Sequence, residues 1–310
     1  MTSLPGTATR RQVSRPAPTT GRGRATTNGL PWVLPAFVFV AGLIYYSVGY
    51  TVYISGLDWD GLAPTAVAVG LGNYTRMLAD PVVWSALQHT AVFWVVTFVA
   101  QTFLGFTLAA IMHSRIRLAT LHKVAIFIPT VLAPATMAPV FRLFFADDGM
   151  LNDILRGVGL GSLAQPWLAQ ASTALPVIMV ITIWQWTGLW FILYYAAMSQ
   201  IEPEVVEAAR LDRAGNIRTL RSIVWPMCRG TTVSLAMLSF IGALKTFDVP
   251  YLVTTGGPYH STEFLGTYIY QQGIRQALIG YAASISIVLL VLAVAGAVVI
   301  GRANRRKVGD

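Results

Sequence analysis

Long stretches without charged residues constrain this chain more than any other feature of its sequence. None of Asp, Glu, Lys or Arg occurs in the windows 25–57, 81–114, 124–141, 157–201, 230–244 and 276–301. A helix needs about 20 predominantly apolar residues to cross the hydrocarbon core of a bilayer. The windows therefore predict six transmembrane helices, over 30–53, 85–112, 124–145, 173–198, 231–253 and 277–300.

The composition agrees with an all-α, polytopic membrane protein. Of the 310 residues, 55% are hydrophobic and 11% are charged, whereas soluble domains average about 25% charged residues. Residues 1–29 are rich in Thr, Arg, Pro and Gly, and should form a disordered, basic cytoplasmic tail. We expect a transmembrane domain over 30–301, with its core over 85–300, and a second basic cytoplasmic tail over 302–310.

The net charge of +9 is distributed in a way that predicts orientation. The five basic residues on the expected outer side, or at outer helix ends, are Arg76, Arg142, Arg156, Lys245 and Arg275. If both termini are cytoplasmic, the other 17 of the 22 Lys and Arg lie on the inner side. Because cytoplasmic loops carry an excess of Lys and Arg, this bias favours that orientation. Topology then explains the basic charge, and nucleic-acid binding is not indicated.

Prolines interrupt the third expected helix. Pro129, Pro134 and Pro139 follow one another at about one-turn intervals. Inside a membrane bundle, neighbouring helices can satisfy the carbonyls that such prolines free. The spacing indicates either a kink that serves packing or a flexible helix that moves during gating.

A charged loop over 199–229 lies between the fourth and fifth expected helices. Pro203 suits a first helical turn, and the acidic residues beside it favour a helix N-terminus. Gly215 and Asn216 should break this helix, and 217–224 can restart it. We therefore expect a helix–turn–helix that lies against the cytoplasmic face.

This loop resembles the EAA loop of binding-protein-dependent ABC importer permeases. The pattern is Glu207-Ala208-Ala209-Arg210-Leu211-Asp212-Arg213-Ala214-Gly215, and it ends at Pro226. In that family the loop is the coupling helix that docks on the ATPase subunit. The resemblance assigns this coupling role to Glu207, Ala208, Ala209, Asp212, Arg213, Gly215 and Pro226. The two alanines would form a small face. Arg213 replaces the family's usual glycine, so Gly215 is expected to take over the turn.

A second pattern is similar to the "FD..Y..T.GGP...T" stretch of maltose-type, first-component permeases of carbohydrate importers. It begins Phe247-Asp248-Val249-Pro250-Tyr251 and continues through Gly256-Gly257-Pro258 to Thr262. Asn73-Tyr74 and Gly149-Met150-Leu151-Asn152 extend the resemblance. The resemblance implies the ABC type I importer permease fold, in a multi-pass protein of the bacterial inner (plasma) membrane.

The resemblance also implies partners. These are membrane lipid, a second homologous permease, an ATP-binding cassette ATPase dimer and an extracytoplasmic sugar-binding protein. This chain has no Gly-x-x-x-x-Gly-Lys-Ser/Thr phosphate loop. We therefore expect ATP and Mg on the partner ATPase, no cofactor in this chain, and no enzymatic activity of its own.

Polar and aromatic residues at membrane depth are the candidates for a substrate pathway. The fourth expected helix offers Trp184, Gln185, Trp186, Trp190, Tyr194 and Tyr195. The same residues are consistent with an aromatic belt and ordinary packing. The resemblance implies sugar contacts at Thr182, Ile183, Gln185, Trp186 and Leu189, and at Ser239, Gly242 and Ala243 of the next helix. Only Ser239 keeps the family's residue type, so maltose itself is not implied.

Lys245 and Asp248 lie three residues apart near the outer end of the fifth expected helix, where they would share one face. They form either a structural ion pair or a substrate contact, and a free Lys245 would favour an anionic sugar such as a sugar phosphate. The four histidines have no ligand spacing. We therefore expect no metal site and no catalytic residue.

The predicted function is translocation of a sugar or sugar derivative in an ATP-driven importer. One alternative is a secondary transporter of a small polar solute, although no inverted repeat or relay of buried acids is readable. A second alternative is an ABC permease for a non-sugar such as glycerol phosphate. A membrane-embedded enzyme would need a catalytic constellation, and none is readable.

Overall fold

The computed structural model describes residues 30–113 and 118–305. The expected tail over 1–29 and the last part of the second tail, 306–310, lie outside the described residues. The chain divides after Ser47 into two compact units. The described part of the first unit is the start of helix α1 (Leu30–Ser55), an apolar stretch whose side chains are mostly exposed.

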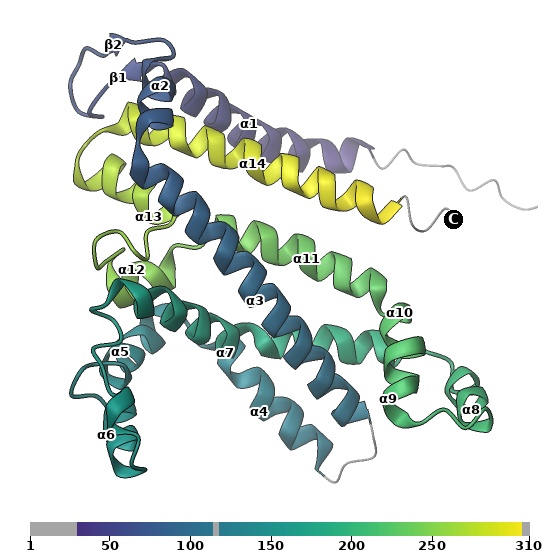
Figure 1. The fold of residues 1–310 in the computed structure, drawn as a ribbon. Helices are drawn as coiled ribbons and strands as arrows, with labels where there is room; N and C mark the ends of the chain where they lie inside the picture. Colours follow the sequence, from purple (N-terminus) through teal and green to yellow (C-terminus); the bar gives the residue numbers. More distant parts are fainter. Residues whose placement is uncertain (1–29, 114–117, 306–310) are drawn as a thin grey trace, which may run out of the picture. The chain divides into compact units, whose positions relative to one another are not determined.

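The second unit, from Val48 onward, is almost entirely helical (Figure 1). After the end of α1 its elements are β1 (Leu57–Asp58), β2 (Val67–Ala68), α2 (Gly72–Ala79), α3 (Pro81–His113), α4 (Ala119–Val131), α5 (Pro134–Phe144), α6 (Met150–Gly157), η1 (Gly161–Leu163), α7 (Ala171–Met198), α8 (Pro203–Leu211), α9 (Asn216–Thr219), η2 (Leu220–Val224), α10 (Trp225–Met227), α11 (Arg229–Leu244), α12 (Asp248–Thr254), α13 (Leu265–Tyr270), η3 (Gln271–Arg275) and α14 (Ile279–Arg305). The element η1 is a 3-10 turn, whereas η2 and η3 are π-helical. The short strands β1 and β2 pair antiparallel, which adds a hairpin to the expected all-α architecture.

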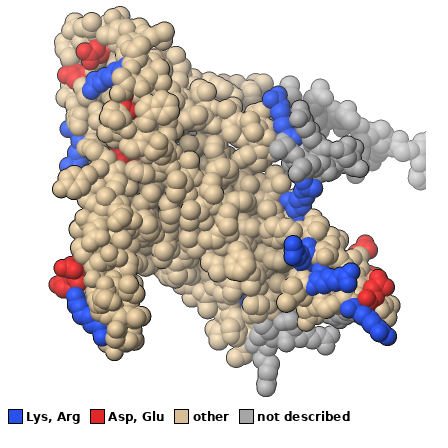
Figure 2. Space-filling model, in the orientation of Figure 1, with Lys and Arg blue, Asp and Glu red and all other residues tan. Residues whose placement is uncertain are grey.

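Four helices are long and apolar enough to cross a membrane, and they lie at α1, α3, α7 and α14. Two helix pairs pass the same test together. The pair α4–α5 bends by 93°, and the segment Asn216–Met227 bends by 65° against α11. Counting each bent pair as one span gives six, the number predicted. On the face in Figure 2, charged side chains gather at α8–α10 and around the hairpin and α6, while the surface between is almost uncharged.

The third predicted helix, 124–145, is a sharply bent pair rather than one helix. Ala133 has an extended backbone (φ −66°, ψ 137°), and Pro134 begins α5. A residue before proline disfavours the helical region, and a proline at the first helical position needs no backbone donor. The Gln185 side chain of α7 donates to the Leu132 carbonyl at 3.1 Å, which satisfies an acceptor at the break. The proline spacing thus marks a kink, and its movement stays a prediction.

The fifth predicted helix, 231–253, is wrong at its outer end, because α11 stops at Leu244 and α12 begins at Asp248. Pro250 lies in the first turn of α12, where it needs no intrahelical donor. Inside one continuous helix it would remove a hydrogen bond and clash with the preceding turn. Lys245 and Asp248 therefore belong to different elements. The expected ion pair between them is absent, and the ion pairs among the described residues lie at Arg156–Asp153 and His260–Glu263.

The core of the second unit forms where α3 and α7 pack along each other. Their backbones approach closely at Gly105, where an added Cβ would lie 2.5 Å from the Cβ of Trp190. One buried cluster holds Phe191, Tyr194 and Cys228 against α3 and α11. A second lies towards α12, and a third joins α2 and α3 to α13 and α14. These contacts position the loop and the pocket described below.

Asp80, between α2 and α3, links the helices of the third cluster through hydrogen bonds. Its carboxylate accepts hydrogen bonds from the hydroxyls of Tyr268 and Tyr281, each at 2.6 Å. Burial acts to raise the pKa of Asp80, but these two hydrogen bonds, together with those from the backbone N–H groups of Val82 and Val83, outweigh it and lower the pKa below its usual range. Burial and the neighbouring carboxylate raise the pKa of Tyr268. The charged form of Asp80 therefore holds α13 and α14 against α3.

Asp80→Asn is expected to lower the thermal midpoint of the solubilised protein by about 2–4 °C. A hydrogen bond to a charged group is worth about 1 kcal/mol more than a neutral one. Because the folded pKa is lowered, this stabilisation is present above the ordinary pKa of 3.8 and is lost as the pH falls through the folded pKa. The difference from the parent protein should be constant from pH 7 to pH 5 and shrink below about pH 4. Asp58→Asn, on the exposed hairpin, is the control and should change nothing.

Candidate coupling loop and substrate pocket

The charged loop folds as a helix–turn–helix, as predicted. Helix α8 runs over Pro203–Leu211 and is followed by Arg213 in the left-handed region, with φ 56°. The backbone N–H of Ala214 donates to the Ala209 carbonyl at 2.9 Å, the bond that closes a Schellman helix end. Gly215 precedes α9 with an extended backbone (φ −67°, ψ 160°). The expectation that Gly215 takes over the turn is wrong, because Arg213 itself adopts the conformation that favours glycine.

Arg213→Gly is expected to stabilise this turn by about 1 kcal/mol, because a residue with a Cβ is strained in the left-handed region. The amide of Ala214 should then exchange its hydrogen about fivefold more slowly, which native-state hydrogen exchange measures. The control is Arg218→Gly, inside α9, where glycine should instead destabilise the helix. Unchanged or faster exchange at Ala214 in Arg213→Gly would contradict the assignment of strain.

The exposed surface of the loop combines charge with large apolar side chains. Glu207, Ala208 and Asp212 are exposed, whereas Ala209 is only 5% exposed and packs inward. Of the two alanines expected to form a small outer face, Ala208 alone lies on it. Leu211 is 85% exposed, and Ile217, on the other side of the turn, is 81% exposed.

The second half of the loop is packed onto the helical core. The ring centroid of Trp225 lies 4.9 Å from that of Phe106 in α3 and 6.3 Å from that of Tyr194 in α7. Tyr194 is fully buried and donates from its hydroxyl to Thr232 in α11 at 2.9 Å. Pro226 follows in α10, and its side chain is exposed. These contacts pack the end of the loop against α3 and α7.

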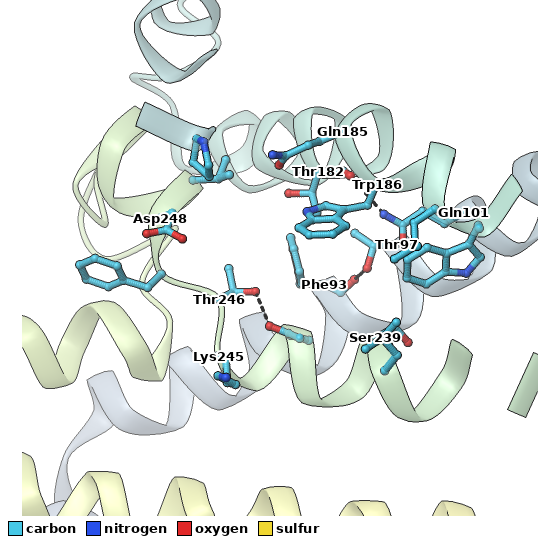
Figure 3. Close-up of a pocket in the computed structure, with 18 residues that line it drawn as sticks. Phe93, Thr97, Gln101, Thr182, Gln185, Trp186, Ser239, Lys245, Thr246 and Asp248 are labelled. Atoms are coloured by element: carbon cyan, nitrogen blue, oxygen red, sulfur yellow. Dashed lines mark hydrogen bonds between the residues drawn. The ribbon is translucent and has the colours of Figure 1, made fainter. Parts of the chain in front are cut away.

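A pocket of about 300 Å³ lies between α3, α7 and the break that separates α11 from α12 (Figure 3). Predicted pathway residues that line it are Thr182, Gln185, Trp186, Leu189, Trp190, Ser239, Gly242, Ala243 and Lys245. Figure 3 shows Trp186 projecting from α7 into the space beside Phe93. Most positions suggested by the resemblance therefore line one cavity, together with Trp186 and Trp190 of the aromatic candidates.

Four predicted candidates do not line this pocket, which corrects the expected pathway. Trp184 packs edge-to-face on Phe141, with ring centroids 5.2 Å apart. Ile183 is also outside the lining, and Tyr194 is buried in the core. The ring of Tyr195 lies under the ammonium group of Lys123 at 3.8 Å. Trp184 and Ile183 thus lie beside the pocket-lining residues without reaching the cavity, and Tyr194 and Tyr195 lie further along α7.

Helix α3 contributes a wall of the pocket that sequence reasoning missed. Phe93, Thr97 and Gln101 all line it, one helical turn apart. Gln101 is 2% exposed, and its side-chain amide donates to the Thr182 carbonyl at 3.1 Å. The sequence signal for this wall was Gln101, an amide side chain inside the uncharged window 81–114. A buried amide needs a hydrogen-bond partner, so Gln101 indicated a polar contact within the bundle.

Two polar atoms at the pocket have unfilled hydrogen-bonding capacity. The Oε1 of Gln185 and the Nε1 of Trp190 are buried, and neither has a partner among the described residues. The first is an acceptor and the second a donor. Both atoms are fully buried behind the surface of the cavity wall, so neither is open to a ligand in the cavity.

Charge reaches the pocket only at its outer edge. Lys245 and Asp248 both line it and are exposed, and neither takes part in an ion pair with another described residue. Among residues 30–113 and 118–305, no group of three or more His, Cys, Asp or Glu side chains is placed to hold a metal ion.

Motif residues outside the pocket hold loops in place. Asn73 donates to the carbonyls of Ser55 and Leu57 at 2.9 and 2.8 Å. Asn152 is fully buried, donates to three loop carbonyls and accepts from the indole of Trp167. Their place in the pattern is thus explained by structure rather than by ligand contact.

A family model described as "Binding-protein-dependent transport system inner membrane component" matches residues 101–308. This match covers most of the chain, including the loop and much of the pocket. The chain therefore belongs to this family of inner-membrane components of binding-protein-dependent transport systems, and it has the type I permease fold.

Relatives of known description cover nearly the whole chain. The probable ABC transporter permease protein YurN of Bacillus subtilis is 30% identical over 85% of this chain and 91% of its own length. The lactose transport system permease protein LacF of Rhizobium radiobacter is 30% identical over 86% of this chain and 90% of its own. A solved bacterial ABC transporter involved in import of the acidic polysaccharide alginate is 18% identical. It has a TM-score of 0.75 over 89% of this chain and 97% of that chain, and supports the fold.

Proposed function

We propose that this chain translocates a sugar or sugar derivative as one membrane subunit of an ATP-driven importer. An extracytoplasmic binding protein delivers the substrate, and a second, homologous permease completes the pathway. Family membership supports the binding-protein-dependent step. The description of LacF as a lactose permease supports the sugar class. The alternatives from the sequence, a secondary transporter and a permease for a non-sugar, are outcomes of the tests below.

The observation that carries the sugar assignment is the chemistry of the pocket. Its wall combines the amides of Gln101 and Gln185 with the rings of Phe93 and Trp186. Sugars present hydroxyl groups at their edges and apolar C–H faces, so amides and aromatic rings recognise both parts.

Charged residues at the edge of the pocket extend the proposal to charged sugar derivatives. Because Lys245 has no ion-pair partner among the described residues, it is available to an anionic group on the substrate. Asp248 at the same edge is equally available to a cationic group or a hydroxyl. A neutral sugar contacts the amides and rings alone. A sugar acid, a sugar phosphate or glycerol phosphate would also contact Lys245.

The helix–turn–helix over α8 and α9 is the proposed connection to the ATPase dimer. Its exposed Leu211 and Ile217 supply apolar contact area, and Glu207 and Asp212 supply charge at the rim. The second half of the loop transmits movement through Trp225 to α3 and α7. In this proposal both termini and the loop are cytoplasmic, the chain is not itself an enzyme, and ATP with Mg binds to the partner.

The composition of the assembled complex tests the proposal. A tagged version of the full chain is extracted in mild detergent, and the proteins that co-purify are identified. We expect an ATP-binding cassette ATPase and a second permease in stoichiometric amounts. Recovery of this chain alone, folded and competent for proton-driven uptake, would favour the secondary transporter instead.

A further inference from the structure

A second cavity, of about 610 Å³, lies beside the loop end of α7 and α11. It is lined on α7 by Leu193 and Ala196, just after α7 by Gln200, and on α11 by Thr231 and Ser234, among others. The substrate pocket lies further along the same two helices. Only one residue, Leu238 of α11, lines both cavities.

The two cavities follow one continuous stripe on each helix. On α7 the stripe runs through Gln185, Leu189, Leu193 and Ala197, in steps of four that return to one helical face. On α11 it runs through Thr231, Ser234, Leu238 and Gly242 in steps of three and four. A solute that leaves the pocket along these faces therefore enters the second cavity.

The chemistry of the lining side chains changes between the substrate pocket and the second cavity. The pocket side carries Gln185 and Ser239, and the loop side carries Gln200 and Ser234. Between these polar residues the lining includes Leu189 and Leu193 of α7 and Leu238 of α11, together with Trp190, Ala196 and Ala197. Leu193 is 37% exposed and Leu238 is 49% exposed, so both remain on the surface of this chain rather than in its core.

We infer that Leu238, together with Leu189 and Leu193 of α7, forms the barrier that separates the substrate pocket from an inner cavity. The inference rests on the proposed function, because it requires a polar solute to move along this face. Bulky apolar side chains at a constriction exclude water, and so block hydrated solutes until the side chains move apart. Helix α11 begins directly after the loop, so movement of the loop shifts Leu238 with it.

Thiol accessibility can locate this barrier, because Cys228 is the only cysteine of the chain. The background variant is Cys228→Ala, to which Gly242→Cys on the pocket side or Ser234→Cys on the inner side is added. An added Cβ at Gly242 meets no atom within 4 Å, so the site has room for a cysteine. The complete transporter is placed in right-side-out vesicles, trapped with ATP and vanadate, and treated from outside with a membrane-impermeant maleimide. Modification is read as a gel shift of this chain.

With Leu238 in place, we expect the thiol at position 242 to react and the thiol at position 234 to stay protected. Leu238→Ala should raise the rate of reaction of the thiol at position 234 by about tenfold or more. Leu238→Met keeps the bulk of the side chain and should leave that thiol protected. Ile241→Ala is the matched control, since Ile241 is a partly exposed apolar residue of α11 that lines neither cavity.

Two results would overturn the inference while leaving the proposed function intact. One is equal outside reactivity of the two thiols in a transporter that still performs ATP-driven uptake. The other is continued protection of the thiol at position 234 when Leu238 is shortened. If the Cys228→Ala complex itself shows no ATP-driven uptake while an intact proton gradient drives it, the proposed function fails and the inference fails with it.

Discussion

Leu211→Asp is expected to release the ATPase subunits from this chain and to abolish ATP-driven uptake. An apolar side chain that anchors an interface is typically worth about 2–4 kcal/mol, and a carboxylate in its place also has to be desolvated. The affinity for the ATPase should therefore fall by about 30-fold to 1,000-fold. Because Leu211 is 85% exposed in this chain, its replacement removes little packing within the chain itself.

The matched control is Leu62→Asp, in the loop between β1 and β2. Leu62 is 87% exposed, so the same change of chemistry is made at an equally exposed leucine away from α8. Both variants are compared for the amount of ATPase recovered with the tagged chain and for the rate of uptake. If Leu211→Asp retains the ATPase and transports normally, the loop is not the coupling element. If both variants lose the ATPase, the effect is not specific to α8.

Trp186→Ala is expected to raise the apparent KM for substrate about tenfold, with a smaller change in the maximal uptake rate. Trp186 lines the pocket and is 39% exposed, so its ring is available to stack on the C–H face of a sugar. Loss of such a stacking contact costs about 1–2 kcal/mol, which corresponds to a tenfold change in affinity. The measurement is uptake of labelled substrate at increasing concentrations of loaded binding protein.

Trp184→Ala provides a control within the same helix. Trp184 is 43% exposed and does not line the pocket, although it lies only two residues away. Its loss removes the contact with Phe141 and should leave the apparent KM unchanged. A larger effect at Trp184 than at Trp186 would move the substrate pathway to a different face of α7.

The positions of the straight helices could be predicted because their signal is local. The uncharged windows that predicted helices over 85–112 and 173–198 coincide with α3 and α7 to within a few residues. The breaks were harder to place. The spacing of Pro129, Pro134 and Pro139 indicated either a kink or a flexible helix, but it did not give the size of the bend. The hydrogen bond to the carbonyl at this break comes from Gln185, which is remote in sequence. The predicted helix over 231–253 wrongly included Pro250 in its interior. A proline is tolerated in the first turn of a helix but not in its interior, so Pro250 indicated the start of a new helix.

The pocket was predicted only in part, for a different physical reason. A helix that is apolar all round gives no indication of which face points inward. Resemblance supplied the correct face of α7 at Gln185, Trp186 and Leu189, whereas aromatic character alone also suggested Trp184 and Tyr194. The wall from α3, including Gln101, arises from packing between segments far apart in the chain. The strained turn at Arg213 was missed because Gly215 is nearby, although the family's usual glycine at position 213 was a signal for it.

Uptake into proteoliposomes tests the central claim most directly. The purified complex is reconstituted with its binding protein and a panel of labelled neutral and acidic sugars, with ATP or a proton gradient as the only energy source. The account predicts uptake that requires both ATP and the binding protein and that the proton gradient alone does not support. Uptake driven by the proton gradient in the absence of ATP and binding protein would contradict it.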